Sequence, residues 1–364
     1  MDFWRGLCLI DMVLVHLYYE NVQFGDKLDR VYGFPLGKVL GEYTRFAAGG
    51  FVLVSGLAIG AIFLPKSLQP GRKWPTYRHL WWRSLKLLGW QYVVAILWVL
   101  LGVIRTNHPP ITSIPKFLLD VIMLHEGDDL LPLYVLLIAA SPMLLAACTI
   151  KGGRLLLAAG SIGLFVLGRY YPIVIAAPGN FPPLLWQIFF VTGLICGSLI
   201  KDYDRLSIAV KRSAAVAAWL LFGVLFWAEY WKALGLPAFP VNIVFSKTPL
   251  TVGELLRYLA AIGGIMVSTD LIWRWISGAA FTAFTATLGR SSLVVYVVHI
   301  FLMEAAGAAA KYWAWMGPWQ LTFIPVSLAI LWLVAITVQW PARRRKAAAE
   351  STWPVLASAR QLGD

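Results

Sequence analysis

The sequence predicts an all-α integral membrane protein, a bundle of about ten transmembrane helices. Of its 364 residues, 59% are hydrophobic and 13% are charged, and the mean hydropathy is +0.71. The surface of a soluble globular protein needs a larger share of charge than this. Eighteen tryptophans and fourteen tyrosines agree with the same class, because their amphipathic rings gather at the two membrane interfaces.

Ten apolar segments are long enough to cross a bilayer core of about 30 Å, which requires about 20 residues per helix. They cover residues 3–19, 45–64, 82–104, 131–149, 154–175, 182–200, 213–231, 252–273, 290–309 and 319–339. The connection 105–130 contains a shorter apolar run, 114–124, which we expect to lie on or re-enter the outer surface. No linker or repeat divides the chain. We therefore predict a single transmembrane domain over residues 1–345 and a cytoplasmic C-terminal tail over residues 346–364.

Positive charge in the connections predicts the orientation of these segments. Lys66, Arg72, Lys73 and Arg78 follow the second segment without an acidic residue, and a basic run beginning at Arg343 follows the tenth. Acidic residues gather in the alternate connections, which hold Glu20, Asp26, Asp29, Glu42, Asp120, Glu126, Asp128 and Asp129. With ten spans, both termini would lie in the cytoplasm. The first segment lacks the basic start and the cleavage site of a signal peptide, so we expect it to be retained.

The net charge of +13 does not indicate a nucleic-acid-binding protein. The basic residues lie between and after apolar spans rather than on one amphipathic face. This distribution fits a protein whose partners are anionic membrane lipid or a polyanionic cofactor, with no nucleic acid.

The first apolar segment carries Arg5, Asp11 and His16. An ionisable side chain at the centre of an inserted helix costs roughly 2.5–3.5 kcal/mol, so its default position is a protein-lined cavity. Arg5 and His16 are eleven residues apart, which places them on one helix face about three turns from each other. A neutral imidazole is a natural general base, so His16 can take a proton from a hydroxyl group. The alternative is a structural histidine bonded to a backbone carbonyl. Asp11 lies off the line joining Arg5 and His16, and we expect it to contact a neighbouring helix and to line the substrate site or pore, together with residues of the ninth segment.

A second polar group lies where the third segment begins. Arg78, Arg83 and Lys86 concentrate positive charge on the cytoplasmic side, and Arg83 and Lys86 share a helix face. Guanidinium groups bind phosphate in a bidentate manner, so a nucleotide-bearing cofactor could dock here. The alternative is that these charges serve only to set the topology.

The ninth segment carries a third polar group. Ser292, Tyr296 and His299 recur at helical spacing and form one polar face on an apolar helix, with Glu304 farther towards the outside. Such a stripe is either a set of interhelical hydrogen bonds or the wall of a cavity, and the sequence leaves both open.

These stretches together resemble the membrane acyltransferase-3 superfamily, and most closely its OpgC-type branch, which modifies periplasmic glucans. The similar stretches are DFWRGLCLIDMVLVH, FVLVSGLAIG, DDLLPLYVLL, WQIFFVTGLICG, SKTPLTVGELLRYLAA and LGRSSLVVYVVH. They span nearly the whole chain and follow one another in the order typical of the superfamily.

The resemblance implies acyl transfer across a bacterial inner membrane. The arginine and histidine of the superfamily's first helix fall on Arg5 and His16, and that histidine is considered the catalytic base. An arginine pair implicated in acyl-CoA handling falls on Arg83 and Lys86, where lysine keeps the charge but not the planar fork. A further histidine pattern falls on His299. The OpgC-type branch implies succinyl-CoA as co-substrate, a periplasmic glucan as acceptor, and no metal.

A succinyl carboxylate inside the pore would need a cationic partner, for which Arg5, Arg257 and Arg290 are the candidates. Homo-oligomers and the glucan-synthesis machinery are further possible partners.

Two other functions fit the sequence. In a proton-coupled secondary transporter of a small solute, intramembrane ionisable residues would form a proton relay or a solute site. The residues concerned are Asp11, His16, Glu254, Arg257 and Glu304. In a non-catalytic scaffold, the chain would only partner a glucan synthase.

Overall fold

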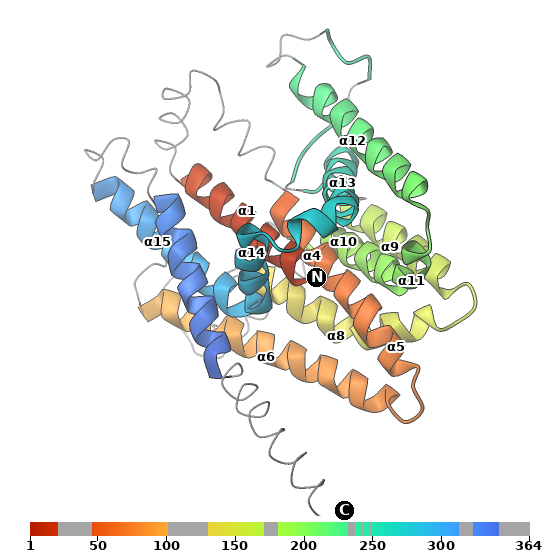
Figure 1. The fold of residues 1–364 in the computed structure, drawn as a ribbon, viewed down its shortest axis with the longest axis horizontal. Helices are drawn as coiled ribbons and strands as arrows, with labels where there is room; N and C mark the ends of the chain where they lie inside the picture. The colour runs from red at the N-terminus through yellow and green to blue at the C-terminus, as the bar shows by residue number, and fades with distance from the viewer. Residues whose placement is uncertain are drawn as a thin grey trace, which may run out of the picture. The chain divides into compact units, whose positions relative to one another are not determined.

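The computed structural model describes residues 1–20, 46–100, 130–170, 181–231, 237–241, 243–247, 249–312 and 323–341 (Figure 1). Within these ranges the regular structure is helical and contains no strand, which confirms the predicted all-α class. Three predictions concern residues outside these ranges. They are the acidic connection after the first span, the surface segment at 105–130 except for its last residue, and the tail at 346–364.

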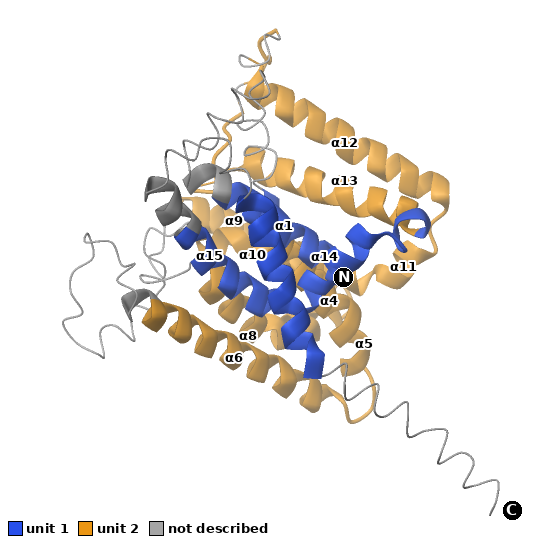
Figure 2. Cartoon of the chain, turned by 60° about the vertical axis from the view of Figure 1, so that its left-hand side comes forward, with its two compact units in different colours: residues 1–47, 274–364 blue, residues 48–273 orange. Residues whose placement is uncertain are grey.

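The chain forms two compact units (Figure 2). Unit 1 joins the two ends of the chain, Met1–Ala47 and Arg274–Asp364, and unit 2 is Ala48–Trp273. The first helix and the ninth predicted segment therefore belong to the same unit although they are far apart in sequence. The single domain over residues 1–345 stays a prediction.

Unit 1 is built around α1 (Asp2–Glu20), which packs on α14 (Ala280–Arg290). The two backbones approach closely because glycine faces the partner on each helix. A Cβ atom at Gly6 would overlap the carbonyl oxygen of Thr285, and one at Gly289 would overlap that of Asp2. The chain then bends by 91° into α15 (Ser292–Tyr312), which also packs on α1. This bend brings α15 from the Asp2 end of α1 towards His16.

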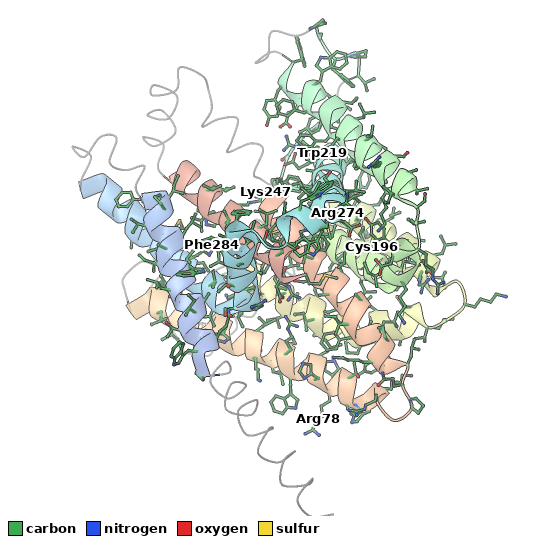
Figure 3. All side chains as sticks on the ribbon, in the orientation of Figure 1. Arg78, Cys196, Trp219, Lys247, Arg274 and Phe284 are labelled. Atoms are coloured by element: carbon green, nitrogen blue, oxygen red, sulfur yellow. The ribbon has the colours of Figure 1, made fainter. Side chains whose placement is uncertain are left out.

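Unit 1 also contains the helix Phe323–Pro341, and unit 2 contains the other helices. They are α4 (Ala47–Ala58), the π-helix η2 (Ile59–Phe63), α5 (Leu64–Ser67), α6 (Lys73–Leu100), α8 (Leu130–Cys148), α9 (Gly153–Tyr170), α10 (Pro183–Ser198), α11 (Ile200–Asp204), α12 (Ile208–Tyr230) and α13 (Val252–Ile276), whose last three residues belong to unit 1. Side-chain hydrogen bonds connect α12 and α13. One runs from Trp219 Nε1 to Ser268 Oγ over 3.0 Å, and Figure 3 labels this tryptophan on α12.

Two glycine pairs hold α4 and η2 against α10. Gly56 and Gly60 face the backbone carbonyls of α10, and Gly193 and Gly197 face those of α4, so that a Cβ atom at any of the four would overlap a carbonyl oxygen. Both sequences have the G-x-x-x-G spacing that allows membrane helices to approach closely. The contacts advance in the same direction along both helices, which are therefore parallel, as the second and sixth of ten alternating spans should be.

The third and fourth predicted segments, α6 and α8, form an antiparallel pair. Trp81 Nε1 donates to the carbonyl of Ala139 over 3.2 Å, and Ser84 Oγ donates to that of Val135 over 2.8 Å. Buried residues of α6 recur at helical spacing, among them Tyr77, Leu80, Ser84, Leu87, Gln91 and Val94. The helix begins at Lys73 rather than near residue 82, because its hydrogen bonding continues through the basic turns that hydropathy excludes.

Each of the ten predicted segments corresponds to a helix. Five helices in the described residues are long and apolar enough to cross a membrane, or six if the bent pair α14 and α15 counts as one span. One of them, Phe323–Pro341, is the tenth predicted segment. Some of the remaining predicted segments form helices that do not meet these length and hydropathy limits, and the reasons are local. For example, α10 has only 16 residues. The chain is a membrane protein, and the number of ten spans stays a prediction.

Candidate active site

His16 lies in the last turns of α1, and the helix is continuous from Asp2 to beyond this residue. Arg5 and His16 therefore share a face of one unbroken helix, as their spacing predicts. Arg5 lies near the start of this face, and both side chains are half-buried. The helix separates a guanidinium group from an imidazole by about three turns.

His299 of α15 is the neighbour that the structure places against His16. Its side chain is fully buried, and its Nε2 lies 3.2 Å from His16 Nδ1. The ring centres are 5.1 Å apart and the ring planes differ by 21°, so the two rings are nearly parallel. The other nitrogen of His299, Nδ1, lies 2.6 Å from the carbonyl oxygen of Tyr296. Two imidazoles in this arrangement can share one hydrogen bond, in which the nitrogen that carries the proton donates to the other.

A pair of arginines lies at the opposite end of α1. Arg5 Nη1 is 3.6 Å from one carboxylate oxygen of Asp2, and Arg290 Nε is 3.7 Å from the other. Asp2 thus holds two guanidinium groups near each other, one from α1 and one from the last residue of α14. Asp2 is not among the residues that the sequence patterns predict to be functional. Its position three residues before Arg5, in the first turn of the helix, was the available signal.

The other polar residues of α15 differ in their surroundings. The Tyr296 side chain is buried, with its ring centre 5.2 Å from that of His299, whereas Ser292 is half-buried at the start of the helix. The backbone of Glu304 is helical, but its side chain lies outside the described residues. The described part of the predicted polar face is therefore centred on Tyr296 and His299.

Asp11 is buried on α1, with 6% of its surface exposed. Its Oδ2 has no hydrogen-bond partner among the residues that the structure describes. A buried carboxylate oxygen without a donor is costly. Its role in the pore stays a prediction.

The basic residues of α6 belong to unit 2. Arg78 and Lys86 are exposed and Arg83 is half-buried, while the buried face of this helix packs on α8. Figure 3 shows the Arg78 side chain projecting away from the ribbon. Of the residues predicted to bind the cofactor, Arg5 lies in unit 1 and the other three lie together on one helix of unit 2.

Unit 2 contains a buried charge cluster around Arg257. Its guanidinium contacts the carboxylate of Glu229 on α12 and lies 2.7 Å from Glu254 Oε2 on its own helix. The aromatic rings of Tyr230, Phe245 and Tyr258 surround it at about 6 Å. Because two carboxylates already neutralise Arg257, it is a weaker candidate than Arg5 or Arg290 for binding a substrate anion.

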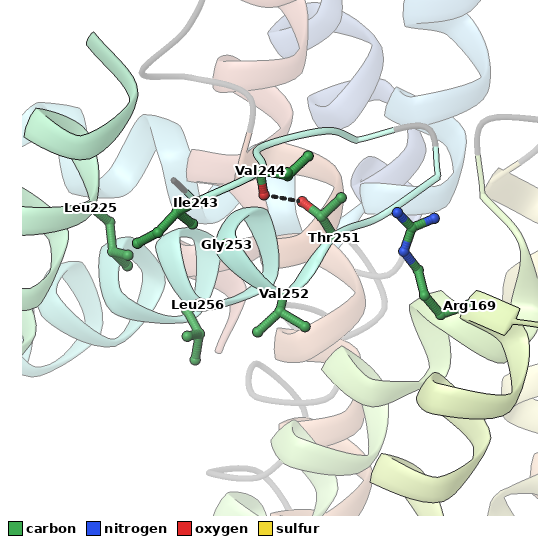
Figure 4. A pocket seen from close by; sticks show the side chains of 8 residues that line it. All are labelled: Arg169, Leu225, Ile243, Val244, Thr251, Val252, Gly253 and Leu256. Atoms are coloured by element: carbon green, nitrogen blue, oxygen red, sulfur yellow. Dashed lines mark hydrogen bonds between the residues drawn. The ribbon is translucent and has the colours of Figure 1, made fainter. Parts of the chain in front are cut away.

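A cavity of about 430 Å³ lies near the start of α13 (Figure 4). Among the described residues of its lining, Arg169 is the only charged one, and the others are Leu225, Ile243, Val244, Thr251, Val252, Gly253 and Leu256. The hydroxyl of Thr251 donates to the carbonyl of Val244 over 2.9 Å. This lining suits an apolar or amphipathic molecule.

A family model described as OpgC protein matches residues 1–343. No curated protein and no solved structure matches the chain.

Proposed function

The chain belongs to the OpgC family, which implies a glucan-modifying acyltransferase, and from this premise we propose that it is a transmembrane O-acyltransferase. The donor in this proposal is acyl-CoA from the cytoplasm, specifically succinyl-CoA. The acceptor is a hydroxyl group of a periplasmic glucan. The observation that supports the proposal best is the contact between His16 and His299 within one unit.

In the proposed reaction, His16 acts as general base. It takes the proton from the glucan hydroxyl while the oxygen attacks the thioester carbonyl. The carbon–sulfur bond then breaks, and the CoA thiolate takes the proton from the His16 imidazolium. The products are a glucan ester and CoA with a free thiol, and His16 is neutral again. No metal ion takes part in this sequence of steps.

The donor needs cationic groups at its phosphates and at the succinyl carboxylate. The pair formed by Arg5 and Arg290 supports binding of one such anion, because two guanidinium groups share the one carboxylate of Asp2 and the three side chains together keep a positive charge. We assign the CoA phosphates to the basic face of α6, which carries Arg78, Arg83 and Lys86. Guanidinium groups recognise both kinds of anion through charge-assisted hydrogen bonds.

The setting of the proposed reaction is a bacterial inner membrane with both termini in the cytoplasm. Membrane lipid surrounds the spans, and the proton chemistry would take place towards the outer end of α1. Self-association and contact with the glucan-synthesis machinery remain proposals that the family match leaves open.

The decisive experiment uses the purified chain in lipid nanodiscs with succinyl-CoA and glucan. Released CoA and the mass increase of the glucan are measured together. We expect His16→Gln to lower kcat by about 10²–10⁴, the contribution of a general base. His79→Gln, which removes an exposed histidine of α6, should leave the rate unchanged. Full activity of His16→Gln would contradict the proposal, as would proton-coupled solute flux without CoA release.

A further inference from the structure

The hydrogen bonds around His299 determine which of its nitrogens carries the proton. The carbonyl oxygen of Tyr296 can only accept a hydrogen bond, so the nitrogen 2.6 Å from it, Nδ1, must be the donor. A neutral imidazole has one donor and one acceptor nitrogen. His299 Nε2 is therefore the acceptor. Because the side chain is fully buried, bulk water does not compete for this arrangement.

The same reasoning extends to His16. Its Nδ1 lies 3.2 Å from the acceptor nitrogen of His299, so a hydrogen bond between them requires the proton on His16 Nδ1. The basic lone pair of a neutral His16 is then on Nε2. The carbonyl of Tyr296 thus determines the protonation of two rings in succession, through contacts within unit 1.

We propose that His299 is a positioning residue that holds His16 in the Nδ1–H tautomer and directs its Nε2 towards the acceptor hydroxyl. This inference rests on the proposed function, because it assigns the basic atom of the proposed base. The role resembles that of a residue that orients a catalytic histidine, whose loss costs activity because the wrong tautomer forms.

The arrangement also determines where the proton goes during the reaction. When His16 Nε2 takes the hydroxyl proton, its Nδ1–H continues to donate to His299. His299 cannot pass a proton onward, because its own Nδ1–H faces a carbonyl oxygen that does not take one. The proton therefore stays on His16 until the CoA thiolate removes it, and no proton crosses the protein.

The first test measures the tautomers directly. The chain contains five histidines, so ¹⁵N spectra of histidine-labelled protein can be assigned with single variants. At alkaline pH, where both rings are neutral, we expect a protonated Nδ1 and an unprotonated Nε2 for both His16 and His299. In His299→Leu the His16 spectrum should shift towards the Nε2–H form. A predominantly unprotonated Nδ1 on His16 in the unaltered protein would overturn the inference, whatever the catalytic activity.

The second test separates positioning from structural support. His299→Leu should lower kcat by about 10²-fold or more, within the range for loss of a general base, with the KM for succinyl-CoA little changed. His299→Gln offers an amide oxygen to His16 Nδ1–H and should recover part of that loss together with the Nδ1–H signature. Equal kcat values and equal His16 spectra in His299→Leu and the unaltered protein would overturn the inference. A different result would contradict the proposed function itself: full acyltransferase activity in the His16→Gln variant.

Discussion

At the scale of single residues, buried charge in unit 2 is balanced locally. Arg257 and Glu254 are three residues apart on α13, and their side chains are 4% and 1% exposed. Glu229 joins them from α12. A buried ion pair of this kind adds little net stability, but removing one partner leaves an uncompensated charge.

We therefore expect Arg257→Met to destabilise the protein by about 3–5 kcal/mol. The matched control is Arg205→Met, because Arg205 also pairs with an acid three residues away, Asp202, but both side chains are largely exposed. This control should change stability by no more than about 0.5 kcal/mol. Thermal unfolding in detergent measures both effects. Equal unfolding temperatures for the two variants would contradict the assignment of Arg257 to the interior.

The arginine pair at the start of α1 gives a second prediction at this scale. Arg290→Gln should raise the KM for succinyl-CoA about tenfold, the loss expected for one charge-assisted hydrogen bond of roughly 1.5 kcal/mol, with kcat little changed. Arg274→Gln removes an exposed arginine of the same unit, whose guanidinium lies over the Trp275 ring, and should leave KM unchanged. Steady-state kinetics distinguish the two variants, and an unchanged KM in Arg290→Gln would exclude this residue from donor binding.

At the scale of helices, close backbone contact holds both units together. Gly6 and Gly289 permit it between α1 and α14, and Gly56 and Gly193 permit it between α4 and α10. In a bilayer, helix association relies on van der Waals packing because lipid is as apolar as the side chains. Small residues at these positions therefore determine which helices become neighbours.

Gly193→Ala should destabilise the protein by about 1–3 kcal/mol or more, because its Cβ atom would overlap the carbonyl oxygen of Leu53 and separate the helices. Gly163→Ala on α9 is the control, since no described atom lies within 4 Å of its added Cβ. Unfolding temperatures in detergent test this contrast. An unaltered unfolding temperature in Gly193→Ala would contradict the close contact between α4 and α10.

At the scale of the whole molecule, the apolar helices differ in how much of their surface the protein covers. In Ala47–Ser67, 83% of the apolar window is buried, whereas the figure for α12 is 11%. A helix that is apolar all round but little covered by protein has lipid as its solvent. These differences agree with a membrane protein whose peripheral helices face the bilayer.

The ten-span orientation gives a prediction at this scale. In cells expressing Lys151→Cys, between the fourth and fifth spans, we expect labelling by a membrane-impermeant thiol reagent only after the membrane is opened. Ala238→Cys, between the seventh and eighth spans, should be labelled in intact cells. Both positions are exposed, and the parent protein with its three native cysteines supplies the background. Labelling of both variants on the same side would refute the predicted topology.

The sequence by itself determined the helical class, the approximate positions of the apolar helices, and the shared face of Arg5 and His16. These features depend on composition and on the period of one helix, which the order of residues contains directly. The sequence also identified Ser292, Tyr296 and His299 as one face of a helix. It left open whether these residues form interhelical hydrogen bonds or line a cavity.

Only the tertiary structure decided that His299 contacts His16, 283 residues away in the chain, and that Asp2 joins Arg5 to Arg290. The period of a helix determines which residues share a face, but which faces meet depends on packing between distant segments. Here that packing follows from glycines on α1 and α14 and from the 91° bend before α15. The isolated histidine of the first helix thereby becomes half of a hydrogen-bonded pair.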